Sequence, residues 1–88
     1  MEKYKIEFYR DAYKELKSVP KDDLTRILKR IEGLSTIPYP VDSKKLKGED
    51  HLKAYRIRQG DYRVVYLVND ERRLVTIAKI GHRREVYR

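Results

Sequence analysis

The sequence contains no cysteine among its 88 residues. Neither a disulfide nor a thiolate metal site can therefore stabilise the fold, and a reducing cytoplasm suits such a composition. No apolar run approaches the roughly 20 residues that a helix needs to cross a membrane. The opening stretch, MEKYKIEFYR, is too charged for the apolar core of a signal peptide. The sequence thus predicts a cytoplasmic protein with no membrane partner.

The chain is also short, and it has neither internal repeats nor the motifs of common cofactor sites. Because the chain has only 88 residues, we expect residues 1–88 to form a single domain with a compact core. Metal-ligand spacing, a phosphate-binding glycine loop and paired carboxylates are all missing from the sequence. We therefore expect no metal ion and no other cofactor.

Positive charge is abundant. The sequence has 22 Lys and Arg against 14 Asp and Glu, a formal net charge of +8. Such a surface attracts polyanions, and nucleic acid comes first among them. An acidic protein partner would also suit it, and a high charged fraction can instead reflect the ion-pair networks of thermophile proteins.

The first half of the sequence predicts a strand and two helices. Residues 4–8 alternate with period two, as in a strand, and residues 11–17 have the charge pattern of a short helix. Pro20 is expected in the first turn of a second helix, which ends near Gly33. Its apolar stripe consists of Leu24, Ile27, Leu28, Ile31 and Leu34.

The second half predicts a sheet. Residues 37–52 read as irregular, and three β-rich runs follow at 53–58, 62–68 and 74–80, separated by turn residues. The order β-α-α-β-β-β predicts an α+β domain with the helices on one face of a mostly antiparallel sheet.

The first predicted hairpin, YRIRQGDYR, concentrates arginine. If Gly60 and Asp61 form a two-residue turn, Arg58 faces Arg63, and a one-residue slip would exchange the two faces. In this register one face carries Tyr55, Ile57, Tyr62, Val64, Tyr66 and Val68. The other face carries Arg56, Arg58, Arg63, Val65 and Leu67.

Two interpretations of the arginine face stay open. It is either a solvated surface whose arginines pair with nearby carboxylates, or an anion site. Facing like charges destabilise a sheet by up to roughly 1 kcal/mol per pair. A phosphate would relieve that repulsion, because guanidinium binds phosphate in a bidentate fork.

The C-terminal stretch GHRREVYR adds further candidates. Gly81 is expected to end the last strand, so that His82, Arg83 and Tyr87 return beside the hairpin. A lone histidine is more often structural than catalytic, and Tyr87 could pack on the sheet edge or stack on a base.

Arginine, histidine and tyrosine together suit metal-independent RNA cleavage, in which the ribose 2′-hydroxyl attacks the neighbouring phosphorus. Guanidinium groups can stabilise the charge that grows on the phosphoryl oxygens. His82, with a reference pKa near ~6.5, could transfer protons.

Three motifs carry a resemblance to a known family. They are K-L-x-G before the hairpin, Y-R-I-R-x-G-D-Y-R-V-x-Y across it and G-H-R-R-x-x-Y near the end. The sequence resembles the RelE branch of the RelE/ParE toxin superfamily over nearly its whole length. The resemblance implies an endoribonuclease toxin that cuts messenger RNA in the ribosomal A site.

The resemblance also implies roles for individual residues. Arg56 and Arg58 occupy two positions at which the best-known RelE member has catalytic lysines. Arg63, Arg83 and Tyr87 match two catalytic arginines and a late tyrosine. Arginine cannot replace lysine as a base, since its pKa exceeds ~12. His82 is a plausible substitute, because other RelE-like toxins use a late histidine.

The implied partners are messenger RNA, the ribosome and a RelB-like antitoxin. RNA contacts are expected at Lys44, Lys45 and Lys47, and antitoxin contacts at Val65 and Leu67. An acidic, partly disordered antitoxin segment would suit a face with apolar and cationic parts. Two alternatives stay open: a ParE-like inhibitor of DNA gyrase that cuts nothing, and a binding module that has lost catalysis.

Overall fold

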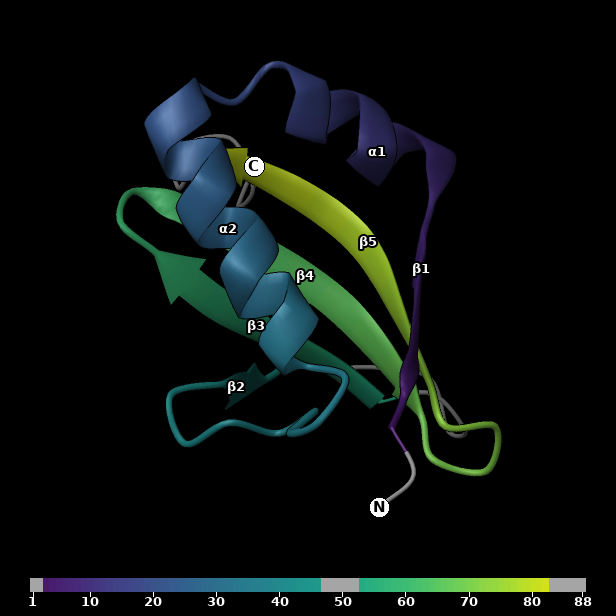
Figure 1. Cartoon of the computed structure of the whole chain (residues 1–88). Coiled ribbons are helices and arrows are strands. Elements are labelled where there is room, and N and C mark those ends of the chain that lie inside the picture. The colour runs from purple at the N-terminus through teal and green to yellow at the C-terminus, as the bar shows by residue number, and fades with distance from the viewer. Residues whose placement is uncertain (1–2, 47–52, 83–88) are drawn as a thin grey trace.

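The structure is a computed structural model that describes residues 3–46 and 53–82. The expected order of strand, two helices and sheet is confirmed, with one added strand (Figure 1). The elements are β1 (Lys5–Phe8), α1 (Arg10–Lys17), α2 (Lys21–Gly33), β2 (Lys44–Lys45), β3 (Lys53–Gln59), β4 (Tyr62–Asn69) and β5 (Leu74–His82).

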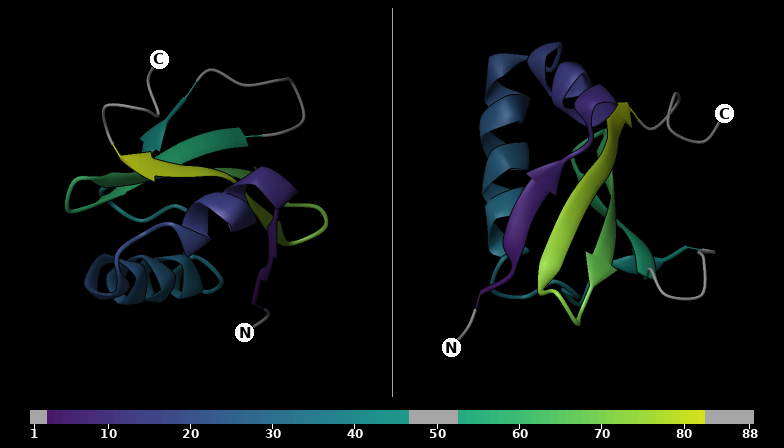
Figure 2. Two further views of the ribbon diagram at one scale, coloured as in Figure 1. Left: turned by 90° about the horizontal axis from the view of Figure 1, so that it is seen from above. Right: turned by 90° about the vertical axis from the view of Figure 1, so that its right-hand side faces the viewer.

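The strands form one sheet in the order β1-β5-β4-β3-β2. β1 runs parallel to β5, and the other neighbours are antiparallel, so the sheet is mixed but mostly antiparallel. Both helices cover the same face of the sheet, and Figure 2 shows that the other face has no helix in the described part of the chain. The predicted α+β architecture is confirmed.

Local sequence explains where the helices begin and what they bury. Asp11 lies in the first turn of α1 and Lys17 in the last, as the helix dipole favours. α2 begins directly after Pro20 and turns Ile27 and Ile31 into the core. Leu28, expected in the same stripe, is 40% exposed at the margin of the buried face.

The core lies between the helices and the sheet. Tyr66 is its largest fully buried side chain, and its hydroxyl donates to the carbonyl oxygen of Pro38 at 2.8 Å. Burial raises the pKa of Tyr66 to about 12. Its buried neighbours are Ala12, Leu16, Val19, Ile27, Ile31, Leu34, Ile57, Val64, Val68, Val75, Ile77 and Ile80.

The sequence predicted an irregular stretch where β2 forms. Lys44 pairs with Arg56 and Lys45 pairs with Tyr55, which makes β2 a sheet edge of two residues. No alternation of apolar residues marks this strand, because both lysines are exposed. Short, lysine-bearing edges discourage pairing with other chains.

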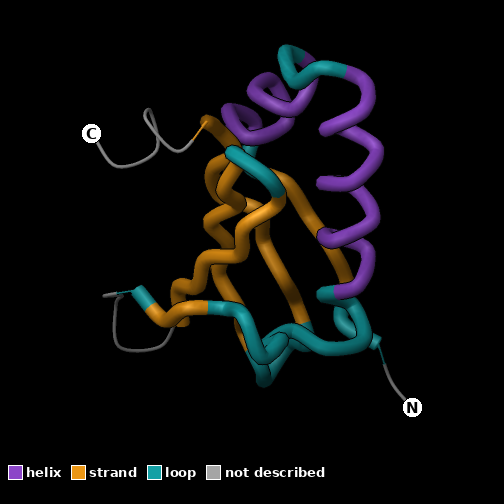
Figure 3. The backbone as a smooth tube through the Cα atoms, turned by 90° about the vertical axis from the view of Figure 1, so that its left-hand side faces the viewer, coloured by secondary structure: helices purple, strands orange, loops and turns teal. Residues whose placement is uncertain are grey.

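The predicted register of the β3–β4 hairpin is confirmed. Arg58 pairs with Arg63 and Ile57 with Val64. Gly60 has φ of +60°, whereas φ of Asp61 is not positive. Positive φ at the first of two central residues is the pattern of a type II′ turn, whose twist matches that of the strands. Figure 3 shows this turn as the short loop that joins β3 to β4.

A β-bulge interrupts β5. Tyr66 pairs with Ile77 and Val65 with Lys79, so Ala78 has no counterpart on β4. A bulge reverses the alternation of side chains after it. Ile77 and Ile80 therefore both point into the core, and both are fully buried.

Asp70, in the β4–β5 turn, ties together the end of the sheet opposite Gly60. Its carboxylate accepts from the hydroxyls of Tyr4 at 2.7 Å and Tyr39 at 2.7 Å, and from Lys53 Nζ at 3.0 Å. The hydrogen bond from Tyr4 is the main reason that the pKa of Asp70 is lowered. β1, the loop after α2, and β3 are thus held to one turn.

Replacing Gly60 with alanine should lower the free energy of unfolding by about 1 kcal/mol, because an L side chain is strained at positive φ. Gly33→Ala is the matched control. Gly33 ends α2 without positive φ and has open space at its Cβ position, so alanine should stabilise by about 0.5 kcal/mol. Thermal unfolding measures both, and equal effects would contradict the type II′ assignment.

Asp70→Asn should lower the free energy of unfolding at pH 7, because it removes the charge that accepts from Tyr4, Tyr39 and Lys53. The loss should be only about 1 kcal/mol, since the carboxylate is partly solvated. The lowered pKa of Asp70 makes its contribution complete above ~3.9 and lost as pH falls through the folded-state pKa. Urea unfolding at pH 7 and pH 3 should therefore show a difference that shrinks in acid. Glu71→Gln, in the same turn but without a described bond, should change little at either pH.

Candidate functional site

Four cations on β2, β3 and β4 lie close together on the face of the sheet that the helices leave uncovered. We call Lys44, Arg56, Arg58 and Arg63 the cationic face. Lys44 lies beside Arg56 across β2 and β3, and Arg58 lies opposite Arg63 across β3 and β4. Opposite residues in a sheet have Cβ atoms about 4.5–5.5 Å apart. Strand pairing therefore concentrates positive charge in two adjacent rows.

Arg56 is the unusual member of this face. It is only 5% exposed, and its Nε donor is shielded from solvent with no hydrogen-bond partner. Among residues 3–46 and 53–82, no ion pair involves Arg56 or Arg58. A buried cation with an unused donor is costly, and an anion bound beside it would reduce that cost.

Of the three lysines expected to contact RNA, the two that the structure describes lie on different faces. Lys44 is on the cationic face, because it pairs with Arg56. Lys45 pairs with Tyr55 and therefore lies on the helix-covered side of the edge. Lys47 lies outside the described residues, as do Arg83 and Tyr87.

The expected end of the last strand at Gly81 is wrong. β5 continues through Gly81, which pairs with Arg63, to His82, which pairs with Tyr62. Strand pairing therefore does bring His82 beside the hairpin. Its ring, however, meets the Tyr62 ring edge-on, with centroids 5.8 Å apart, on the face that carries the core.

The bulge at Ala78 explains why His82 and the arginines lie on opposite faces. Uninterrupted alternation from Ile77 would have put His82 on the cationic face. The extra residue reverses the order, so Gly81 takes the position opposite Arg63. Nothing in the residue types around Ala78 predicts a bulge.

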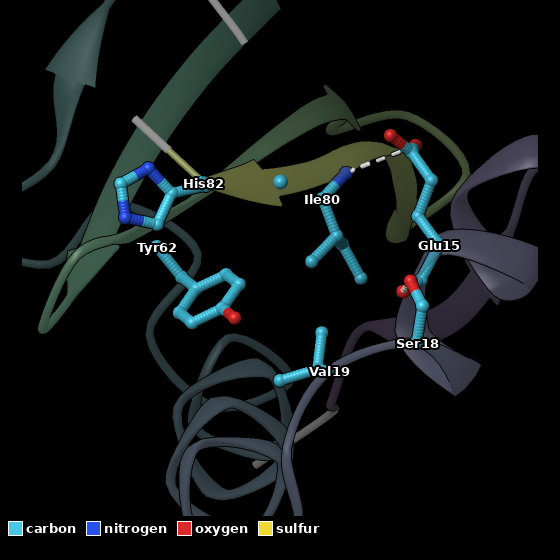
Figure 4. Close-up of a pocket in the computed structure, with 7 residues that line it drawn as sticks. Glu15, Ser18, Val19, Tyr62, Ile80 and His82 are labelled. Carbon is cyan, nitrogen blue, oxygen red and sulfur yellow. Dashed lines mark hydrogen bonds between the residues drawn. The ribbon is translucent and has the colours of Figure 1, made fainter. Parts of the chain in front are cut away.

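A cavity of about 340 Å³ opens on the helix side of the same end of the sheet. In Figure 4, Tyr62 and His82 border one side of it, while Glu15 and Ser18 of the α1 end border the other. Glu15 Oε1 accepts a hydrogen bond from the Ile80 backbone N–H at 3.3 Å. Glu15 was not a candidate from the sequence, because it reads only as a polar residue on a surface helix.

The residues expected to contact an antitoxin adjoin the arginines. Val65 pairs with Arg56, and Leu67 lies two residues farther along β4 on the same face. Both are half-buried and lie outside the core between helices and sheet. The uncovered face thus has a cationic end and an apolar end.

Neither a membrane-spanning helix nor a cluster of metal ligands occurs among the described residues. In this part of the chain, no helix is long and apolar enough to span a membrane. No group of three or more His, Asp or Glu side chains there could hold a metal ion.

Comparison with known proteins assigns the chain to a family. Residues 6–87 match the family described as "ParE toxin of type II toxin-antitoxin system, parDE". The chain is 37% identical over 89 aligned positions to a Methanocaldococcus jannaschii protein named as toxin RelE1, covering 98% of this chain and 97% of that protein. This chain belongs to the RelE/ParE toxin superfamily.

A solved structure and a second sequence relative agree with this family and favour its RelE branch. The RelE–RelB complex from Pyrococcus horikoshii aligns with a TM-score of 0.83 and 35% identity, covering 94% of this chain and 98% of that chain. The Mycobacterium tuberculosis toxin RelG is 31% identical over 97% of this chain and 97% of its own length. The protein is a RelE-like toxin of a type II toxin–antitoxin system.

Arg56→Met in this RelE-like toxin should raise the free energy of unfolding by about 1 kcal/mol, because it replaces a buried, unpaired charge by an apolar chain of similar length. Arg58→Met, at an exposed position, should stay within about 0.5 kcal/mol of wild type. Urea unfolding measures both. Added phosphate should stabilise wild type more than Arg56→Met. A strongly destabilised Arg56→Met would show that the buried guanidinium is structural.

Proposed function

We propose that this toxin is a ribosome-dependent endoribonuclease that cuts messenger RNA in the A site by metal-independent attack of the ribose 2′-hydroxyl. The buried Arg56, with its unused Nε donor beside the Arg58–Arg63 pair, is the observation that carries the proposal. The RelE names of the similar proteins support the same activity.

The cationic face suits the charge that develops in this reaction. A bond forms between the 2′-oxygen and phosphorus, and the bond from phosphorus to the 5′-oxygen breaks. The 2′-hydroxyl loses a proton, and the 5′-oxygen gains one. Negative charge grows on the phosphoryl oxygens between these events, where Arg56, Arg58 and Arg63 would bind them. DNA lacks the 2′-hydroxyl and would not be cut.

The arginines supply charge stabilisation but not proton transfer. Arginine stays protonated in proteins, so Arg56 and Arg58 cannot act as bases. No carboxylate or histidine among the described residues of β3 and β4 adjoins them on their face. We infer that the toxin depends on the ribosome to orient the 2′-hydroxyl for attack. By resemblance, Arg83 and Tyr87 would complete the site.

His82 takes a secondary place in this proposal. Its ring contacts Tyr62 on the opposite face from Arg56, so RNA would have to pass around the end of β5 to meet it. His82→Gln is therefore expected to cut within about threefold of wild type, whereas loss of an arginine costs far more.

We also propose that a RelB-like antitoxin covers Val65 and Leu67 and neutralises the cationic face with acidic side chains. A sheet face left open by helices, with half-buried apolar residues beside cations, suits such a segment. The similar structures from Pyrococcus horikoshii and Methanococcus jannaschii are complexes of RelE with RelB.

Mapping messenger RNA 5′ ends after expression tests the activity. Wild type should arrest translation and produce cuts at A-site codons. Arg63→Ala and Arg83→Ala should each lose at least tenfold in cutting rate, or about 1.4 kcal/mol of transition-state stabilisation. Arg26→Ala, exposed on α2 in the other layer, is the matched control and should cut normally.

The same experiment separates the alternatives. Growth arrest with inhibited supercoiling and intact messenger RNA would instead identify a gyrase inhibitor. Antitoxin binding without cuts at ribosomes would identify a catalytically inactive homologue. Cutting that survives Arg63→Ala would remove the cationic face from the mechanism.

A further inference from the structure

Among the described residues, the last part of β5 has a neighbouring strand on only one side. β1 ends with the pairing of Phe8 and Ile77, and Tyr9 N donates to Ile77 O at 2.9 Å. Beyond that point α1, rather than a strand, lies along the edge of β5 (Figure 1). The backbone N–H groups on this edge therefore need partners from side chains or from water.

Glu15 of α1 supplies such a partner directly after the bulge. Its Oε1 accepts from the N–H of Ile80 at 3.3 Å, and its Oε2 lies 3.8 Å from Lys79 Nζ. Ile80 is fully buried, so its N–H has no easy access to bulk water. Figure 4 shows the Glu15 side chain extending from the helix to the strand across the cavity margin.

These two contacts fall on the residues that immediately follow Ala78. A slip of one residue there would exchange the faces of every later side chain. It would move Gly81 away from Arg63 and turn His82 toward the cationic face. The hydrogen-bonded and charged contacts of Glu15 favour the observed register over the slipped one.

We propose that Glu15 is a positioning residue that fixes the register of β5 after the bulge and thereby sets where the strand delivers its C-terminal residues. The inference rests on the proposed nuclease function for its effect on catalysis. Glu15 touches neither the arginines nor the substrate, so it would act through the backbone of residues 79–82.

Three variants test the proposal. Glu15→Ala removes the acceptor, whereas Glu15→Gln keeps an amide oxygen that can accept from Ile80. Ser18→Ala is the matched control, because Ser18 lines the same cavity but donates only to the Glu15 backbone oxygen at 2.8 Å. The measurements are amide hydrogen exchange at Ile80 and at Gly81, which pairs with Arg63, thermal unfolding, and single-turnover cutting of messenger RNA on ribosomes.

Glu15→Ala should speed exchange at Ile80 and Gly81 at least tenfold while Val64 stays protected. Its single-turnover rate constant should fall about tenfold with an unchanged half-saturating ribosome concentration. Glu15→Gln should restore both values to within about threefold, and Ser18→Ala should match wild type. A protein that is merely less stable would instead exchange faster throughout the sheet.

Unchanged exchange at Ile80 in Glu15→Ala would overturn the proposal, as would equal losses in the alanine and glutamine variants. Exchange is read without RNA, so the two hypotheses fail separately. A wild type that cuts nothing overturns the nuclease function and its dependence on Glu15. The exchange comparison then decides alone whether Glu15 holds β5.

Discussion

The pairing of Arg58 with Arg63 across a two-residue turn fixes the arrangement of both faces of the sheet. With this register, Ile57 and Val64 enter the core while Arg56 and Arg63 stay on the uncovered face. A shift by one residue would bury guanidinium groups under the helices and expose the core, which makes the register strongly specified. The positive φ of Gly60 permits the tight turn on which this pairing depends.

The charges on the uncovered face lower the stability of the fold. Facing arginines repel, and the buried Arg56 leaves a donor unused. The stabilising contacts lie elsewhere: the core around Tyr66 behind the sheet, and the Asp70 cluster at its far end. The local cost on this face is thus separated from the contacts that stabilise the domain.

The end of β5 links the two layers of the domain. The bulge at Ala78 allows one strand to bury both Ile77 and Ile80 while keeping Gly81 opposite Arg63. The same bulge places His82 against Tyr62. Glu15 reaches this strand from α1, so the helix that contributes to the core also contacts the strand that leads into the C-terminal residues.

Period-two alternation and turn residues determined the hairpin, because burying Tyr55, Ile57, Val64 and Tyr66 together allows a single register. Helical spacing likewise determined α2, apart from the exposed Leu28. Only the tertiary structure decided the burial of Arg56, the edge strand β2, and the face of His82. These depend on contacts between residues distant in sequence, such as Lys44 with Arg56 and Glu15 with Ile80, and on a bulge that no local residue pattern encodes.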